Sequence, residues 1–570
     1  MKPLLFFLSS CVFGPAFSFQ LQPSVGVGVT RNHGARRTIL KTTQNDASLE
    51  DVLVSETASQ STTSNGITAT LFPATRATPS SSQRPLSNRQ QLDEQYPQFP
   101  RTWVPIASTL ELDHSRPNRL EFLDQSYVAY RNPQSNNQQW VVMDNTCPHR
   151  LAPLSEGRVE PETGRLQCSY HGWTFEADGS CQRIPQVVPS VEQSAMANPR
   201  SCFPSYSTML DARTGVLWVW PWQQDPLEFV GDEWRHPEGF MEGLILDPSI
   251  QNATEAGIMT YTRDQPYGWD TLVENLIDPA HIPFAHHGMQ GSRSDAIPIN
   301  MTSATNLGEA GFAFEWQDRT MGMMRTGEGK FRAPFLVNYN ATFASPTGEA
   351  KPFRLSALCI PTRPGWSRVM VFSIPTTSAA AKDNTSTNNR IKTFKLGPIM
   401  AQLFKRLPTW GSHLLSNKFF DSDLAFLHYQ EQLRFDDESA NSNLQRGDAR
   451  YFMPAECDRS IVALHGWIGN YASSYVKRQS TKLPPAIYDR SILFDHFDQH
   501  TSKCKICSTA LDKLQRRKRN SQIVLAASIL LGLRFWPMRL LAVASLGTWR
   551  FWSQIEGKFY KGEFKHHQNH

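Results

Sequence analysis

Short apolar runs separated by polar turns fill the chain from about residue 98 to residue 225. The clearest runs are Trp103–Ile106, Tyr127–Tyr130, Trp140–Met143 and Val216–Trp220, each rich in aromatic or β-branched residues. Segments rich in Asn, Gly and Pro separate them, and this alternation is typical of β-strands joined by turns. We therefore expect a small all-β domain over residues 98–225.

The pattern is mixed between residues 226 and 500. Strand-like runs alternate there with a helical segment near Thr271–His281. This mixture predicts a second domain of α+β type, an antiparallel sheet with helices packed on it. A stretch rich in Thr, Ser, Ala and Asn, residues 376–392, predicts an inserted loop.

The N-terminal part does not carry the pattern of a folded domain. Residues 1–16 are apolar after Lys2 and indicate a signal peptide. Residues 17–46 contain four basic residues and a single acidic one at the very end, the composition of a transit peptide. Together they resemble the two-part plastid leader of algae with secondary plastids, and a simple secretory signal is the alternative. Residues 47–97 are rich in Ser, Thr, Gln, Asn and Pro and predict a disordered linker.

The C-terminal tail changes character twice. Residues 501–520 hold two cysteines and a basic run, and residues 521–570 begin with a largely apolar stretch, 523–546, that is interrupted by two arginines and a proline and flanked by charged and aromatic residues. The apolar part predicts either two short helices in a hairpin or one kinked span, associated with a membrane through its aromatic boundary. The alternative is a buried core helix. The basic run is expected to stay on the side where the domains fold.

Composition narrows the function classes. The chain has 570 residues, a net charge of +5, 40% hydrophobic residues and nine cysteines. The small net charge gives no basic field suited to nucleic acid, so we expect no nucleic-acid partner. Nine cysteines in a chain of this length are too few for a disulfide framework, and short-range Cys/His patterns therefore favour metal or redox chemistry.

The first such pattern mixes cysteine and histidine in two short motifs. Cys147 and His149 form C-x-H, and after eighteen intervening residues Cys168 and His171 form C-x₂-H. A Rieske [2Fe–2S] cluster needs two thiolates on one iron and two imidazoles on the other, and each motif supplies one of each. A Cys₂His₂ zinc site pairs like with like instead. The spacing therefore predicts a Rieske cluster.

The second pattern lies about a hundred residues further on. His281 and His286 could supply the two histidines of a facial triad, which holds non-haem Fe(II) and leaves positions open for O₂. On a regular helix they would point about 140° apart, so we expect Pro283 to break the helix between them. His287 is the competing ligand for His286, and Asp278 lies on the face of His281.

The carboxylate of the triad has to come from elsewhere in the chain. The best candidate is the short acidic group ahead of a helical segment, where Asp423 is the first choice and Asp421 the second. Either aspartate could instead be a solvated N-terminal helix cap.

Four segments together resemble the Rieske oxygenase family over about residues 100–500. Within that family, the four segments resemble more specifically the pheophorbide a oxygenase branch, which includes chlorophyllide a oxygenase and plastid translocon proteins. The segments are 147–157, 170–173, 275–288 and the C-x₂-C at 504–507.

The resemblance implies a helix-grip-like catalytic domain, a Rieske cluster and a mononuclear Fe(II). It also implies a head-to-tail homotrimer, in which Asp278 joins a cluster histidine of one subunit to an iron histidine of the next. Reduced ferredoxin would be the electron donor, and a chlorophyll-derived tetrapyrrole would be oxidised with O₂. The location would be a plastid, at the inner envelope or thylakoid membrane.

Other functions remain open within this resemblance. The substrate could be chlorophyllide a, a sterol or a carotenoid rather than pheophorbide a. The protein could also be a redox-sensing subunit of an envelope import complex, although such a sensor would not need His281, His286 and a carboxylate.

Cys504 and Cys507 form the C-x₂-C of the tail. Thiols so spaced can form a reversible disulfide, and we expect Lys503 and Lys505 to lower their pKa. Regulation by a thioredoxin is the functional hypothesis. A zinc half-site or inert thiols are the alternatives.

Overall fold

The computed structural model describes residues 61–62, 68–70, 87–135, 139–229, 231–244, 259–344, 351–373, 408–435, 451–532 and 534–564. The predicted signal peptide, the transit-like segment and the predicted loop at 376–392 lie outside the described residues, as does most of the predicted linker.

Folded structure begins earlier than the predicted boundary at residue 98. Helix α2 (Asn88–Gln95) starts at a capping box, in which the Ser87 side chain and Gln90 bond each other's backbone N–H groups. Leu92 on this helix is fully buried and belongs to the main core. The end of the predicted linker is therefore part of the fold.

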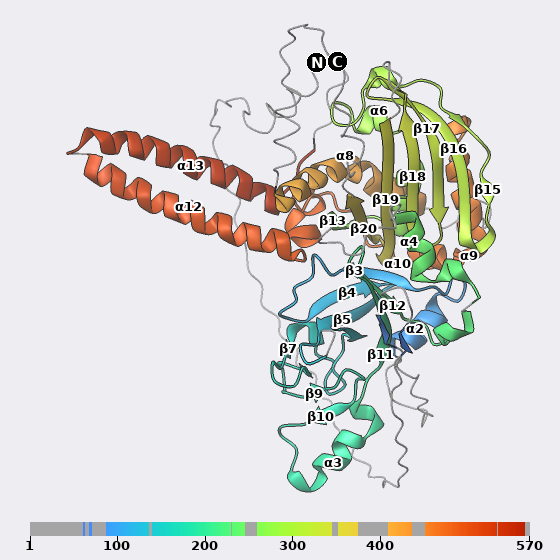
Figure 1. Cartoon of the computed structure of the whole chain (residues 1–570), viewed down its shortest axis with the longest axis vertical. Coiled ribbons are helices and arrows are strands. Elements are labelled where there is room, and N and C mark those ends of the chain that lie inside the picture. The colour runs from blue at the N-terminus through green and yellow to red at the C-terminus, as the bar shows by residue number, and fades with distance from the viewer. Residues whose placement is uncertain are drawn as a thin grey trace, which may run out of the picture. The chain divides into compact units, whose positions relative to one another are not determined.

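The N-terminal domain is an antiparallel sheet, as the apolar runs predict (Figure 1). Its strands follow the order β1-β2-β11-β6-β5-β4, and β12 pairs with both β11 and β3. The bounds are β1 Ser61–Thr62, β2 Thr68–Thr70, β3 Val104–Ser108, β4 Asn118–Phe122, β5 Gln125–Arg131, β6 Trp140–Asp144, β11 Ser205–Asp211 and β12 Val216–Trp220. The four predicted runs correspond to β3, β5, β6 and β12.

A smaller sheet carries the two Cys/His motifs. Its order is β10-β9-β8-β7, with bounds β7 Arg158–Val159, β8 Leu166–Gln167, β9 Thr174–Phe175 and β10 Cys181–Arg183. Helix α3 (Pro189–Ala197) follows it and was not expected in an all-β domain. Pro189 in its first turn, where a missing N–H costs nothing, is the local signal for that helix.

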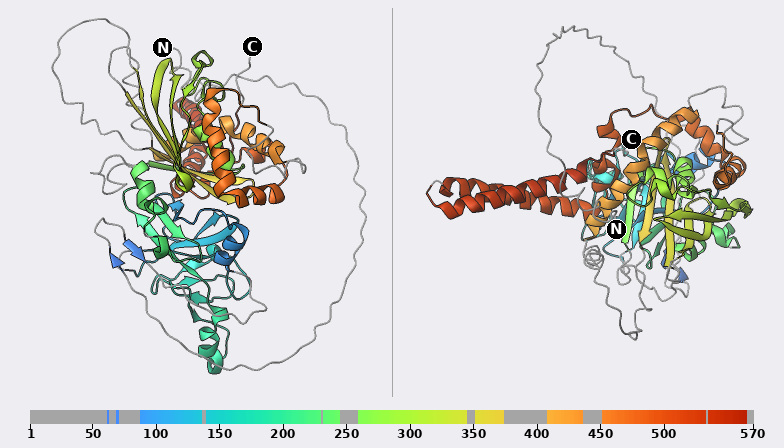
Figure 2. Two further views of the ribbon diagram at one scale, coloured as in Figure 1. Left: turned by 90° about the vertical axis from the view of Figure 1, so that its right-hand side faces the viewer. Right: turned by 90° about the horizontal axis from the view of Figure 1, so that it is seen from above.

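The second domain is built on a large antiparallel sheet, which confirms the α+β expectation (Figures 1 and 2). The order is β13-β20-β19-β18-β17-β16-β14, and β15 also pairs with β16. The bounds are β13 Met259–Gln265, β14 Asn300–Met301, β15 Thr305–Asn306, β16 Gly311–Thr320, β17 Met323–Arg332, β18 Leu336–Phe343, β19 Lys351–Arg363 and β20 Trp366–Ser373.

Alternating side chains explain how this sheet faces a core. In β16 Phe312, Phe314 and Trp316 are buried, whereas Glu315 and Gln317, at alternating positions, are exposed. Successive side chains of a strand point to opposite faces, so one face of β16 packs inward. Helices cover the sheet, with bounds α4 Pro237–Leu244, α5 Trp269–Ile277, α6 Ile282–Ala285, α8 Thr409–Phe435, α9 Arg459–Tyr471, α10 Ser473–Lys482 and α11 Arg490–Leu493.

The two domains share one hydrophobic core. Phe99 lies between them, with its ring centroid 6.3 Å from that of Trp222 and 5.8 Å from that of Trp269. All three side chains are almost fully buried. Large aromatic rings buried on both sides of a boundary fix the domains to each other.

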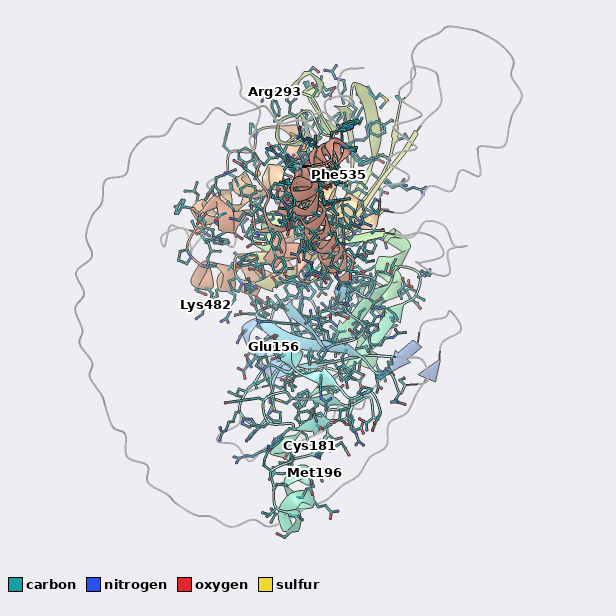
Figure 3. The ribbon with its side chains drawn as sticks, turned by 90° about the vertical axis from the view of Figure 1, so that its left-hand side faces the viewer. Glu156, Cys181, Met196, Arg293, Lys482 and Phe535 are labelled. Carbon is teal, nitrogen blue, oxygen red and sulfur yellow. The ribbon has the colours of Figure 1, made fainter. Side chains whose placement is uncertain are left out.

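The C-terminal tail forms two helices that run side by side in both figures, α12 (Lys505–Gly532) and α13 (Trp536–Tyr560). This is the helical hairpin, one of the two predicted arrangements. Phe535, labelled in Figure 3, lies at the turn between the helices. Among the described residues no helix combines the length and the apolar character needed to cross a membrane, so a membrane-spanning tail finds no support.

Candidate active site

Two loops with the same backbone geometry present the Cys/His motifs. The N–H of Leu151 donates to the carbonyl of Cys147, and the N–H of Gly172 donates to that of Cys168, both at 2.9 Å. Each cysteine N–H then donates to the residue five positions on, again at 2.9 Å. Leu151 and Gly172, at matching positions, both have positive φ, 59° and 75°. The sequence therefore folds into two near-equivalent clamps.

The side chains of these clamps separate into buried thiols and more accessible imidazoles. Cys147 and Cys168 are 1% and 2% exposed, whereas His149 and His171 are half-buried, with ring centroids 4.5 Å apart. His149 stacks on Trp173 at 4.8 Å, and its buried Nδ1 has no hydrogen-bond partner in the described chain. A buried ring nitrogen without a partner is costly unless a metal takes it. The four residues fit a Rieske cluster whose histidine edge faces outward.

The two histidines of the second motif flank a single helical turn. Helix α5 ends at Ile277, and the short α6 begins after His281 and ends before His286. The expectation of one helix through Thr271–His281 is therefore wrong at its C-terminal end. Pro283 does not break a longer helix but sits in the first turn of α6, where its fixed φ favours the helix.

This arrangement brings the two histidines and one aspartate together. Nε2 of His286 lies 3.3 Å from Nε2 of His281 and 3.2 Å from Oδ2 of Asp423. All three ligand atoms lie within 4.8 Å of one another, close enough for a single coordination sphere. The other carboxylate oxygen of Asp423 is buried without a hydrogen-bond partner among the described residues. Two histidines and a carboxylate are the donor set that suits non-haem Fe(II).

Neighbouring groups orient both histidines. Nδ1 of His286 lies 2.8 Å from Oγ of Ser422, whose own hydroxyl donates to the Phe419 carbonyl, so Nδ1 is the donor. The His286 ring also stacks on Phe419 at 4.0 Å. Nδ1 of His281 faces Oδ2 of Asp278 at 3.4 Å. Such contacts fix each ring so that Nε2 points at the metal position.

Electrostatics at the site follow from burial and these contacts. Burial raises the pKa of Asp423 to about 6, although His281 acts against it. Burial lowers the pKa of His281, but Asp278 and Asp423 outweigh it and raise the value to about 9. Without a metal the two groups thus hold a proton between them, and a cation would displace that proton.

The alternative ligands face elsewhere. Asp421 accepts from buried Arg263 at 2.9 Å and lies 2.9 Å from Nε2 of His496. Nδ1 of His287 accepts the backbone N–H of Arg293 at 3.1 Å. Neither belongs to the group of atoms around His286. The geometry therefore favours Asp423 and His286, the first choices.

The acidic group does not precede a helix, as the sequence suggested, but lies inside α8. Helix α8 is buried along much of its length, with Asp421, Ser422 and Asp423 in consecutive positions all 3% exposed or less. A helix buried on several faces lacks the one-sided apolar period that sequence analysis detects. Its beginning was missed for that reason.

Cys504 and Cys507 lie where α12 begins, and both are buried. The expected effect of the neighbouring lysines is wrong, because Lys503 pairs with Asp264 and Lys505 with Asp113. The structure instead brings two histidines to the thiols, His413 and His500. Sequence analysis missed them, although the spacing His500-x₃-Cys504-x₂-Cys507 was a readable signal on one helical face.

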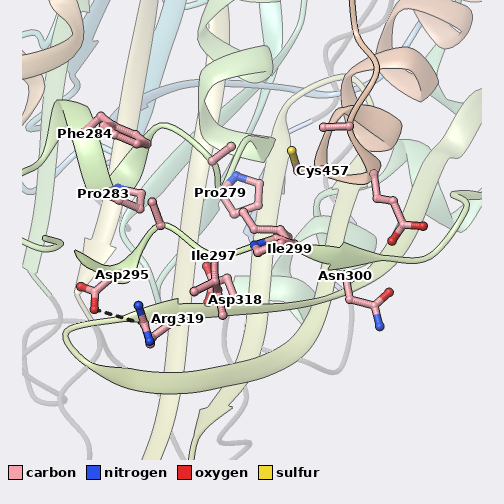
Figure 4. Close-up of a pocket in the computed structure, with 15 residues that line it drawn as sticks. Pro279, Pro283, Phe284, Asp295, Ile297, Ile299, Asn300, Asp318, Arg319 and Cys457 are labelled. Carbon is pink, nitrogen blue, oxygen red and sulfur yellow. Dashed lines mark ion pairs between the residues drawn. The ribbon is translucent and has the colours of Figure 1, made fainter. Parts of the chain in front are cut away.

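A cavity of about 500 Å³ adjoins the iron-site segment (Figure 4). Pro279, Pro283 and Phe284 line one side, and Ile297 and Ile299 line another. The three candidate iron ligands are not part of its lining. An apolar cavity of this size with a few polar groups is the usual form of a small-molecule site.

Comparisons with known proteins match two segments of this chain to known families. Residues 102–204 match the Rieske [2Fe-2S] domain, and residues 331–440 match the family described as Pheophorbide a oxygenase. The first match confirms the domain predicted from the Cys/His spacing.

Full-length relatives extend this agreement. The chain is 31% identical over 430 residues to a chloroplastic pheophorbide a oxygenase of Oryza sativa subsp. japonica, covering 72% of this chain and 73% of the relative. It is 29% identical to flavonoid 8-hydroxylase 2 of Ocimum basilicum, covering 81% and 85%. It is 28% identical to protein TIC 55 of Pisum sativum, covering 82% and 81%.

Among solved structures, dicamba monooxygenase bound to dicamba is similar at 16% identity, with a TM-score of 0.43 and coverage of 67% and 97%. The identity and coverage of the rice relative, together with the two matched domains, decide the assignment. This chain therefore belongs to the Rieske non-haem iron oxygenase family, in the branch that contains the pheophorbide a oxygenases.

Proposed function

We propose that the protein is a ferredoxin-dependent monooxygenase of a chlorophyll-derived tetrapyrrole, similar in activity to pheophorbide a oxygenase. The observation that carries this proposal is the convergence of His281, His286 and Asp423 in a chain that also holds a Rieske domain. A protein that only transferred or sensed electrons would not need a second, three-ligand metal site.

The bound groups supply the redox chemistry: single electrons from the cluster and O₂ activation at the ferrous ion. Residues of this chain position the ligands of these groups. Ser422 and Phe419 hold the His286 ring, and Asp423 brings a carboxylate into a buried site. Three ligands of this kind would hold the ion and leave positions open for O₂. The burial of the His286 and Asp423 side chains limits the access of water to the site.

Asp278 has the position expected of an electron bridge. One of its carboxylate oxygens faces His281, and its side chain is still 22% exposed. The exposed part can meet a cluster histidine of another subunit in a head-to-tail homotrimer. The half-buried His149 and His171 are the matching donors, because a ligand imidazole keeps one ring N–H free to donate.

The cavity beside the iron segment suits an apolar ring system with an acidic substituent. Its lining is mostly Pro, Ile, Ala and Phe, and Arg319 is its one guanidinium among the described lining residues. Arg319 pairs with Asp295 at 3.7 Å, a loose contact that a substrate carboxylate could compete for (Figure 4). Pheophorbide a and chlorophyllide a both present a large apolar macrocycle with one carboxylate.

The relatives keep other functions in view. The similarity to a flavonoid 8-hydroxylase adds a flavonoid to chlorophyllide a, sterols and carotenoids as candidate substrates. The similarity to a chloroplastic protein named protochlorophyllide-dependent translocon component 52 supports, as a non-enzymatic candidate, a redox-sensing subunit of an import complex. That candidate predicts capture of translocon subunits without oxygen uptake on any pigment.

We place the protein in a plastid, as the chloroplastic relatives suggest, at the inner envelope or thylakoid membrane. The support for membrane association is the helical hairpin. Many apolar side chains of its outer part are exposed, among them Leu530 at 71%, Trp536 at 70% and Val543 at 70%. Exposed apolar helices flanked by basic residues bind at a membrane surface without crossing it.

Anaerobic reconstitution tests the enzymatic proposal. The holoprotein is reduced with ferredoxin, mixed separately with pheophorbide a, chlorophyllide a, a flavonoid and a sterol, and then given ¹⁸O₂. We expect one ¹⁸O atom in a product of pheophorbide a, with O₂ uptake abolished in Asp423→Asn. Turnover of the flavonoid or the sterol alone would reject the tetrapyrrole assignment. Labelled chlorophyllide a would keep the tetrapyrrole class and change only its member.

A further inference from the structure

The second group of metal-type side chains is separate from the iron-site residues and lies at the base of the helical hairpin. We name it the Cys₂His₂ cluster, formed by His413, His500, Cys504 and Cys507. All four side chains are 1% exposed or less, and their ligand atoms lie within 4.8 Å of one another.

The distances inside the cluster match the edges of a tetrahedron around one ion. Nδ1 of His413 lies 3.4 Å from Sγ of Cys507 and 3.6 Å from Sγ of Cys504. Nε2 of His500 lies 3.2 Å from Sγ of Cys507. Tetrahedral zinc, with Zn–S near 2.3 Å and Zn–N near 2.1 Å, sets sulfur and nitrogen ligands about 3.6 Å apart.

Both histidines turn one ring nitrogen toward the thiols. Nδ1 of His500 lies 2.5 Å from the Thr262 carbonyl, which can only accept, so Nδ1 is the donor and Nε2 is the atom that faces Cys507. A ring held in this way by a carbonyl is the usual outer contact of a metal-bound histidine. Nδ1 of His413 faces the sulfurs of both cysteines, and its Nε2 is buried without a hydrogen-bond partner in the described chain.

The charge on the cluster also suits a divalent cation. A hydrogen bond from Cys504 lowers the pKa of Cys507, against the effect of burial, and contacts with His413 and His500 lower it further. Burial raises the pKa of Cys504, and contacts with Cys507 and the charge of Glu111 raise it further. Two thiolates and two neutral imidazoles would cancel the charge of Zn²⁺.

Local structure presents three of the ligands on one face. His500 lies in a short π-helical turn, Phe497–Thr501, and the N–H of Cys504 donates to its carbonyl at 3.0 Å. Residues three and four apart on a helix are neighbours, so 500, 504 and 507 face the same way. The fourth ligand, His413, comes from the first turns of α8.

We propose that the Cys₂His₂ cluster binds one structural zinc ion, which fastens the base of the α12–α13 hairpin to α8. The same helix α8 carries Asp423, ten residues or about 15 Å along its axis. The apolar cluster at the hairpin base is small, with Ala510, Leu511, Leu514 and Phe559 as its buried members beside the two cysteines. A metal clip is the usual device where a core is too small to hold an element.

Zinc and a thioredoxin-sensitive disulfide are competing uses of the same two thiols. A disulfide exchanged by another protein needs a thiol within reach of solvent, and both sulfur-bearing residues are 1% exposed or less. The two imidazoles aimed at the thiols complete a set of four ligands, which a metal requires and a disulfide does not. The structure therefore favours the metal.

The test uses the full-length holoprotein purified without chelators, so that it is independent of oxygenase activity. Metal analysis is expected to find about one zinc per chain beside about three irons. X-ray absorption at the zinc edge is expected to show two sulfurs at about 2.3 Å and two nitrogens at about 2.0–2.1 Å. Because this measurement uses the unaltered protein, it does not depend on the folding of any variant.

Matched variants locate the ion. Cys507→Ser and His413→Gln are expected to lower the zinc content at least about tenfold. The visible absorption of the Rieske [2Fe–2S] cluster should not change. Cys202→Ser, a half-buried cysteine outside the cluster, should keep both. The proposal is overturned by zinc-free protein that takes up no added zinc, by a fourth iron in the site, by an oxygen-rich zinc shell, or by a Cys504–Cys507 disulfide in the isolated protein.

Discussion

Asp421 and Asp423 are two residues apart in α8 but meet opposite surroundings. Asp421 lies between Arg263, which is fully buried at 2.9 Å, and the ring of His496. Asp423 points to the histidine pair and has one oxygen without a partner among the described residues. One aspartate is thus part of the framework, and the other is free to bind a metal.

Substituting each aspartate should separate these roles. Asp423→Asn is expected to lower iron content and turnover at least about 100-fold with the Rieske spectrum unchanged, because a metal ligand is lost. Asp421→Asn should destabilise the fold by about 3–5 kcal/mol, because Arg263 stays buried without a countercharge. Iron analysis, the cluster EPR signal and thermal unfolding distinguish the two. Equal effects of both variants on iron would contradict the assignment.

Glu431, one turn from the end of α8, predicts a pH dependence of stability. It is 1% exposed, and burial raises its pKa to about 8 although the Gly268 N–H acts against this. A raised carboxyl pKa means that the folded state binds the proton more tightly. Its contribution to stability is therefore complete below the ordinary value near 4.5 and is lost as pH rises through about 8.

The matching experiment compares melting temperatures of Glu431→Gln and the unaltered protein at pH 5 and pH 8. The variant should gain relative stability at pH 8, because it carries no charge to bury. Glu162→Gln, at an exposed position, is the control and should track the unaltered protein. A difference that is the same at both pH values would show that Glu431 does not titrate in this range.

At the scale of elements, the exposed apolar side chains of the helical hairpin are the proposed contact with a membrane. Its base packs against α8 and the π-helical turn, whereas Leu530 and Val543 in its outer part are 71% and 70% exposed. Leu530→Asp or Val543→Asp should leave the fold intact and lower the affinity for anionic vesicles, measured by co-sedimentation, at least about tenfold. The reason is that burying each of these side chains in lipid contributes about 1.5–3 kcal/mol to binding.

Leu227→Asp is the matched control for this measurement. Leu227 is an apolar side chain 60% exposed outside the hairpin, and its substitution should leave vesicle binding unchanged. Equal vesicle binding by all these variants would show that the hairpin is not the contact with lipid.

At the scale of the whole molecule, the proposed trimer makes each active site a joint product of two chains. A chain with His171→Ala lacks a working cluster, and a chain with Asp423→Asn lacks a working iron site. Each should be inactive alone, and co-expression should restore activity at about a quarter of the sites, where an intact iron faces an intact cluster.

The control co-expresses Asp423→Asn with a chain that carries both substitutions, which offers no intact iron and should stay inactive. Electron transfer within a single chain predicts no recovery in either mixture. Activity measured per iron therefore decides between transfer within a chain and transfer between chains.

What the sequence determined by itself is what short segments encode. The Rieske motifs could be predicted because the cysteine and the histidine within each motif lie within five residues of each other on a tight loop. The strands of the first domain could be predicted because their apolar runs are separated by turn residues. The histidine pair was readable for the same reason. The linker boundary failed because α2 has a single deeply buried apolar residue and no apolar stripe.

Tertiary structure decided what depends on distant partners. Arg263 on β13, more than 150 residues earlier in the chain, forms an ion pair with Asp421. This contact decides that Asp423, and not Asp421, faces the histidines. His413 meets Cys504 and Cys507 only through packing of α8 on α12, about ninety residues away. Composition predicted an apolar tail, but the hairpin and its exposed face follow from the pairing of two helices. Local periodicity carries no information about such contacts, because they are selected by the packing of the whole chain.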